Sequence, residues 1–143
     1  MYASTRTATD DTQPVLLMGS QDLDHCKIYD MNQYYSQMGS SVQWTDSELS
    51  TIAVLKGGSL LATRTTVNGG LEFAGVVGFK VRDSLLRGDN DQFGILPGLD
   101  GTPSSGVLTG SRLADQAVCL YLRSSTVVLD RTGFDNCGQA LIA

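Results

Sequence analysis

The sequence predicts a mainly β fold, a small β-barrel or β-sandwich-like domain with an extended N-terminal arm and a short C-terminal helix. Between Thr51 and Leu129, short runs rich in Val, Leu, Ile, Phe and Thr alternate with glycine-containing turn segments. This spacing is typical of a compact all-β domain. The same stretch contains no histidine and no recognisable nucleophile motif, which favours a structural or binding module over an enzyme. The β-prone runs are residues 52–55, 59–67, 71–81, 106–109 and 117–129.

The first third of the chain predicts a polar arm, a short strand and a turn-rich region. Residues 1–14 are rich in Ser, Thr and Asp and indicate a mobile arm. Residues 15–18 predict a first strand, and residues 19–30 are acidic and turn-rich. Residues 31–38 fit either one or two helical turns or an irregular aromatic patch, because periodicity does not separate the two.

Glycine turns divide the central region into strands. Residues 51–55 and 59–62 flank Gly57-Gly58, which predicts a hairpin between two apolar strands. Residues 71–81 alternate apolar and polar side chains, and their two glycines allow a bulge or a bend as at a barrel corner. No internal repeat longer than a turn motif is evident.

The last third predicts a loop, two strands and a terminal helix. Residues 88–105 are loop-like, although residues 93–96 suit a pairing segment. Residues 107–108 and 117–128 predict the last strands, and residues 134–143 predict a short helix that packs back on the domain. The domain organisation that follows is a flexible arm over residues 1–14 and a single β-rich domain over residues 15–143.

Composition narrows the classes of partner and compartment. The net charge is −5 and only ten Lys and Arg residues are present, so the basic footprint of a generic nucleic-acid binder is missing. No apolar run approaches the length of a membrane span, and no signal peptide is recognised. Three cysteines without a paired motif make a disulfide scaffold unexpected and favour a reducing compartment. Cys119 lies in an apolar strand and is expected to be a small core residue.

The chemistry-bearing residues form no convincing site. The single histidine, His25, lies near Asp22, Asp24 and Cys26, but adjacent residues point in different directions, so a polar surface loop is favoured over a metal site. Residues 89–100 echo a calcium-binding loop but place Phe and Pro at ligand positions, which favours an exposed acidic turn. The sequence therefore predicts no catalytic residue, no metal and no cofactor.

Aromatic side chains gather where the sequence is otherwise polar. Tyr34, Tyr35 and Trp44 lie in this region, together with Tyr29, Met31 and Met38. Tyr, Trp and Met are enriched in the cores of protein interfaces, so these residues suit a contact surface. They suit an ordinary hydrophobic core equally well.

Residues 51–62 (Thr-Ile-Ala-Val-Leu-Lys-Gly-Gly-Ser-Leu-Leu-Ala) resemble a strand pattern of the lambda-type head decoration proteins, which cement the capsids of tailed bacteriophages. Residues 106–109, 117–122 and 134–143 follow in the order of that family's later strands and terminal helix. The resemblance implies a small β domain that assembles as a homotrimer on the capsid exterior after synthesis in the host cytoplasm. It also implies that the arm adds a strand to the major capsid protein.

The functional hypothesis is a non-enzymatic virion protein that binds the outside of a phage capsid and bridges its subunits, without nucleic acid or membrane contacts. A tail or connector component is a second hypothesis, and a small β-barrel enzyme or ligand-binding domain around Asp22, Asp24 and His25 is a third. The expected partner-binding residues are Tyr2, Thr5, Arg6, Val15, Leu16, Tyr34, Tyr35 and Trp44.

Overall fold

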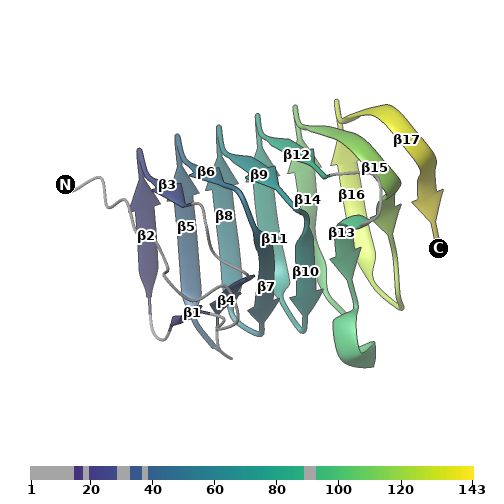
Figure 1. Cartoon of the computed structure of the whole chain (residues 1–143). Coiled ribbons are helices and arrows are strands. Elements are labelled where there is room, and N and C mark those ends of the chain that lie inside the picture. The colour runs from purple at the N-terminus through teal and green to yellow at the C-terminus, as the bar shows by residue number, and fades with distance from the viewer. Residues whose placement is uncertain (1–14, 18–19, 29–32, 37–38, 89–92) are drawn as a thin grey trace.

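The computed structural model describes residues 15–17, 20–28, 33–36, 39–88 and 93–143, and these residues are almost all β (Figure 1). The chain winds into a parallel β-solenoid, in which each coil contributes three strands and stacks on the previous coil. Every ladder between described strands is parallel, and a strand pairs with the strand one coil further along the chain. Equivalent positions in the central coils are 18 or 19 residues apart, as Tyr34, Ala53 and Leu71 show.

The strands form three lateral faces. One face of the larger sheet holds β1 (Val15–Leu17), β4 (Gln33–Ser36), β7 (Ile52–Lys56), β10 (Leu71–Ala74) and β13 (Phe93–Pro97). Another holds β3 (Lys27–Ile28), β6 (Glu48–Leu49), β9 (Thr66–Asn68) and β12 (Leu85–Arg87), and β15 (Arg112–Tyr121) joins both. The smaller sheet, called sheet B below, holds β2 (Gln21–Asp24), β5 (Ser41–Thr45), β8 (Ser59–Thr63), β11 (Val77–Arg82), β14 (Ser105–Thr109) and β16 (Thr126–Asp130). The last strand, β17 (Gly133–Ile142), pairs with β15, and a short 3₁₀ turn, η1 (Leu99–Gly101), follows β13.

The core is a set of apolar rows that run along the solenoid axis. Ala53, Leu71, Ile95 and Leu120 occupy one row in register, and all four are essentially inaccessible to solvent. The alternation of strand side chains sends every second residue inward, so an in-register stack places like residues above one another. Each fully buried aliphatic side chain stabilises the fold by about 1.5–3 kcal/mol.

A ladder of small polar side chains holds one corner of the coils together, between sheet B and the strands that follow it. The Ser84 hydroxyl accepts a hydrogen bond from the Thr65 amide at 3.1 Å and donates to the Arg82 carbonyl at 2.7 Å. The hydroxyl of Ser111, which lies in the next coil, accepts a hydrogen bond from the Ser84 amide at 3.2 Å. The Ser47 hydroxyl likewise accepts from the Cys26 amide at 3.1 Å. Buried backbone amides at the turn are thereby satisfied by the coil above.

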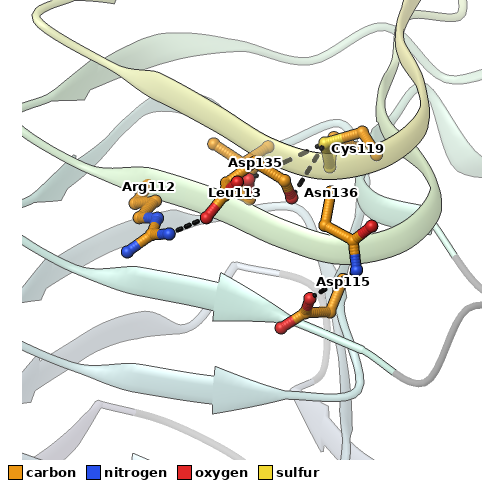
Figure 2. The surroundings of a disulfide bond; sticks show 7 residues. Arg112, Leu113, Asp115, Cys119, Asp135 and Asn136 are labelled. Carbon is orange, nitrogen blue, oxygen red and sulfur yellow. Dashed lines mark hydrogen bonds and ion pairs between the residues drawn. A yellow bond between two sulfur atoms is a disulfide. The ribbon is translucent and has the colours of Figure 1, made fainter.

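A disulfide joins Cys119 of β15 to Cys137 of β17, one coil apart (Figure 2). The two Cα atoms are 5.7 Å apart, within the range that a disulfide spans without backbone movement. Cys119 is fully buried, as expected, but the expectation that the chain has no structural disulfide is wrong. The sequence separation of 18 residues is close to one coil, so the disulfide links two successive coils of the solenoid.

The prediction of a barrel- or sandwich-like domain with a C-terminal helix is wrong. Residues 133–142 form strand β17, and the helix implied by the resemblance is absent there. The predicted hairpin at Gly57-Gly58 is wrong too, because β7 and β8 belong to different sheets and do not pair. Gly58 has a φ of +71°, and an added Cβ would lie 1.9 Å from the Ser40 carbonyl oxygen of the preceding coil. Close stacking of coils therefore requires glycine at this corner.

Candidate functional site

Sheet B presents an outward face on which side chains of successive coils stand in register. Strand alternation places one of its rows at the middle of each strand, and a second row two residues later. The middle row is Asp22, Gln43, Leu61, Lys80, Val107 and Val128, and the second row is Asp24, Thr45, Thr63, Arg82, Thr109 and Asp130. Figure 1 shows the strands of sheet B side by side along the solenoid axis, so rows of in-register residues run parallel to that axis.

The centre of this face is cationic and its two ends are acidic. Lys80 and Arg82 are exposed on β11, beside a shallow hollow of about 100 Å³ that Val107 and Thr109 also line. Within the part of the chain that the structure describes, neither cation has a carboxylate within 4 Å. Acidic residues occur only in the terminal coils of the second row, at Asp24 and Asp130. The two central cations are therefore free to meet an acidic group of a partner.

Exposed apolar side chains flank these cations. Val77 of β11 is 69% exposed and Val128 of β16 is 54% exposed, which makes them the two most exposed large hydrophobic residues described. Both lie on sheet B and point away from the core. Apolar surface next to unpaired charge on a regular sheet is a composition that suits a protein contact.

A second cluster of titratable groups lies at the corner between sheet B and the following strands. His25, Asp46 and Arg64 each adopt positive φ values there, one per coil. The Arg64 guanidinium donates two hydrogen bonds to the Asp46 carboxylate, at 2.6 and 2.7 Å. His25 Nδ1 lies 2.5 Å from Asp24 Oδ1, and its Nε2 lies 3.8 Å from Asp46 Oδ2. The column thus places the Asp46 carboxylate between the His25 imidazole and the Arg64 guanidinium along the axis.

This corner column borders an open groove of about 450 Å³. The hydrogen bonds from Arg64 hold the pKa of the Asp46 carboxyl below its usual range. Asp24, His25 and Asp46 offer ligand atoms that lie within 4.8 Å of one another, so their spacing alone suits a cation. The guanidinium of Arg64 already occupies both Asp46 oxygens, and the groups neutralise each other without an ion. The arrangement therefore suits a structural charge ladder better than a metal centre.

The residues expected to bind a partner are dispersed by the fold. Tyr2, Thr5 and Arg6, with the rest of the predicted arm over residues 1–14, lie outside the described residues, as do positions 89–92 of the predicted acidic turn. Val15 and Leu16 lie in β1, where their backbones pair with those of Tyr34 and Tyr35 in β4.

Tyr34 and Trp44 lie in the hydrophobic core and not on a contact surface. Both are fully buried, and their rings meet edge to face with centroids 5.3 Å apart. The Tyr34 hydroxyl donates a hydrogen bond to the Gln21 side chain, and burial raises the pKa of Tyr34 to about 12. The contact-surface hypothesis for these two side chains is therefore corrected in favour of the core.

Sequence reasoning missed Lys80, Arg82 and the in-register rows of sheet B. A signal was present: residues 41–45, 59–63 and 105–109 all begin with Ser and end with Thr. The first two segments are 18 residues apart, which is one coil. Reading this pattern as a repeat would have placed the intervening 77–82 segment, with both cations, on the same face.

Comparisons of the chain with protein-family models, with curated proteins and with solved structures found no match. In the described part of the chain, no helix combines the length and the apolar character needed to cross a membrane.

Proposed function

We propose that the protein is a non-enzymatic structural module that binds a partner protein through the outward face of sheet B. The observation that carries the proposal is the pair Lys80 and Arg82 at the centre of that face, neither of which has a carboxylate within 4 Å among the described residues. A parallel solenoid holds such groups at fixed positions, so little conformational entropy is lost by the backbone on binding. The exposed Val77 side chain on the same strand adds apolar contact area.

The partner proposed is the major capsid protein on the exterior of a phage capsid. Its support is the resemblance of residues 51–62 to a strand pattern of the decoration proteins, together with the overall acidity of the chain. An acidic protein is repelled by packaged nucleic acid and suits the outside of a shell. Residues 1–14 would act as a clasp that pairs with a sheet edge of the capsid protein.

The test is co-sedimentation with expanded capsid shells of a lambda-type phage from which the resident decoration protein has been removed. The double variant Lys80→Glu/Arg82→Glu is expected to bind at least about tenfold more weakly, because the two carboxylates would repel an acidic partner that the two cations attract. The control variant Lys27→Glu/Arg87→Glu makes the same change in net charge on another face and is expected to bind like the unaltered chain.

Three outcomes separate the parts of the proposal. Equal binding by the two double variants would exclude the face of sheet B, and loss of binding on deletion of residues 1–14 alone would assign the contact to the arm. Binding to purified tails but not to shells would favour the tail or connector hypothesis.

The rival hypothesis of an enzyme or a ligand-binding domain centres on the corner column. His25→Ala is expected to leave binding to shells unchanged, because His25 lies at the corner and not on the outward rows of sheet B. Turnover by the purified chain that disappears in His25→Ala would contradict a non-enzymatic function.

A further inference from the structure

Within the described residues, the coil formed by β16 and β17 leaves strand edges unpaired at the end of the solenoid that lies opposite β2. Among the described strands, β16 pairs only with β14, and β17 pairs only with β15, so each has one free edge (Figure 1). Side chains that continue the core rows are exposed there. Leu108 and Leu120 are 0% and 1% exposed, whereas their in-register successors Leu129 and Leu141 are 40% and 49% exposed.

An unpaired edge of this kind is a template for another strand. Among the described residues, the backbone amides and carbonyls that point away from β14 and β15 have no ladder partner, and Leu129 and Leu141 beside them are partly exposed. Disulfide Cys119–Cys137 holds β17 against β15, so the open end is anchored to the preceding coil (Figure 2). The unpaired edges of β16 and β17 therefore form a docking surface that is tied to the preceding coil.

We propose that the occupant is the same end of a second copy of this chain, related by a two-fold axis, which makes a closed end-to-end dimer. A two-fold axis that is perpendicular to the solenoid axis and passes just outside the free edge of β16, level with Val128, pairs that strand antiparallel with β16 of the second copy. Val128 then faces its own copy, Val127 faces Leu129 of the other copy, and Thr126 faces Asp130 of the other copy. Opposite residues of an antiparallel pair lie on the same face of the sheet, so the inward side chains meet inward ones.

The same axis pairs β17 with itself. The centre of β17 lies between Cys137 and Gly138, about ten residues beyond Val128, which is close to half of the 21 residues that separate Val107 from Val128. An axis that crosses the middle of sheet B, one side of the three-sided coil, leaves the coil at the opposite corner. The centre of β17 lies at that corner, because β17 pairs with β15, which spans the other two faces. Phe134 then faces Leu141 of the second copy. The exposed ends of the core rows, at Leu129 and Leu141, are thereby covered by the second copy.

Charge disfavours the alternative, a head-to-tail stack. In that arrangement β16 would pair in parallel with β2 of the next copy, and continuation of the register would set Asp130 beside Asp24 and Val128 beside Asp22. Like charges directly across a ladder are destabilising. The two-fold pairing instead sets Asp130 opposite Thr126 and places no two carboxylates of β16 across from each other. It also closes, whereas a head-to-tail stack grows into a filament.

The two-fold pairing is tested by cross-linking the full chain. Val128→Cys places one thiol opposite its own copy at the axis, and mild oxidation is expected to convert most of the chain to a disulfide-linked dimer. Val77→Cys is the matched control, because Val77 is a more exposed valine on the same sheet but two coils away from the open end, and it is expected to stay uncrosslinked. Equal cross-linking of the two variants would overturn the proposal.

Mass measurement gives a second, independent readout. Light scattering of the unaltered chain is expected to give twice the 15.3 kDa of one copy, and Val128→Glu is expected to shift the mass to that of one copy because two carboxylates would face each other at the axis. Val77→Glu is expected to remain dimeric. A monomer, a trimer as implied by the resemblance, or a filament for the unaltered chain would overturn the proposal, as would a Val128→Glu variant that stays dimeric. Shell binding by Lys80→Glu/Arg82→Glu is measured separately, so failure of the dimer and failure of the proposed function are distinguishable.

Discussion

Replacement of Ser84 by Ala tests the polar ladder that joins the coils. The Ser84 hydroxyl accepts a hydrogen bond from the Thr65 amide and donates one to the Arg82 carbonyl, and the residue is only 5% exposed. Alanine removes both bonds and takes away the acceptor of the buried Thr65 amide. An unsatisfied buried amide costs about 1–3 kcal/mol, so the free energy of unfolding is expected to fall by about that amount.

Ser84→Thr is the matched control. Thr65 and Thr132 hold the equivalent position in other coils, and each hydroxyl bonds the carbonyl two residues earlier, as Ser84 does. These threonines show that the donor bond to the Arg82 carbonyl is kept, and a threonine hydroxyl is also expected to accept from the Thr65 amide as serine does, so the loss is expected to stay under about 1 kcal/mol.

Urea unfolding followed by circular dichroism measures both variants, and hydrogen exchange of the Thr65 amide localises the effect. The amide is expected to exchange faster in Ser84→Ala than in Ser84→Thr, because only the first loses the acceptor. Equal stability of Ser84→Ala and the unaltered chain would refute the reasoning. So would a Ser84→Thr variant that is destabilised as much as Ser84→Ala.

Three further predictions concern separate parts of the molecule. Replacing both Cys119 and Cys137 by Ser is expected to lower the free energy of unfolding by about 3 kcal/mol in denaturant titrations, from the closure entropy of an 18-residue loop. Burial, and secondarily a nearby carboxylate, raises the pKa of Glu72, so the folded state binds this proton more tightly. The contribution of Glu72 to the free energy of unfolding is therefore fully present below the normal carboxyl pKa and is lost as pH rises through the raised pKa. Thermal melts of Glu72→Gln are expected to lack this loss and to show a higher midpoint at neutral pH. Gly106→Ala places a Cβ 2.3 Å from a buried ring and is expected to cost about 1–3 kcal/mol in chemical unfolding, whereas Gly133→Ala, with no atom within 4 Å, is expected to be neutral.

Strand positions in the second half of the chain were largely predictable from sequence. The predicted run at residues 52–55 corresponds to β7 (Ile52–Lys56), and the run at 106–109 corresponds to β14 (Ser105–Thr109). Local β propensity and glycine turns carry this information, because they depend on neighbours along the chain.

The partner of each strand was not predictable in the same way. A glycine corner such as Gly57-Gly58 has the composition of a hairpin turn, but here it passes the chain to another sheet. Parallel pairing one coil away is a long-range property, and only the recurrence of Ser and Thr at 18- or 19-residue intervals reports it. The small and aliphatic residues of segment 134–143 suit a helix, yet the segment pairs as a strand with the edge of β15.

The candidate sites, like the strands, were predictable only where they depend on residues that are close in sequence. Aromatic residues in a polar context suggested a surface, but Trp44 and Tyr34 fill the core of the early coils, where large side chains replace the smaller residues of later ones. The neighbours of His25 were recognised only in part, because Asp46 and Arg64 come from the next two coils. Lys80 and Arg82 became a candidate site only when the register placed them at the centre of one face.

Distances between spin labels along one row test the parallel in-register stack most directly. Both the partner-binding face and the end-to-end dimer depend on this stack. Nitroxides at Asp22 paired in turn with Leu61, Lys80 and Val107 sample two, three and four coil steps. Strands of a sheet are about 4.8 Å apart, so the backbone separations are expected to rise in even steps to about 19 Å for the last pair. Distances that do not increase with the number of coils would contradict the solenoid and the sites built on it.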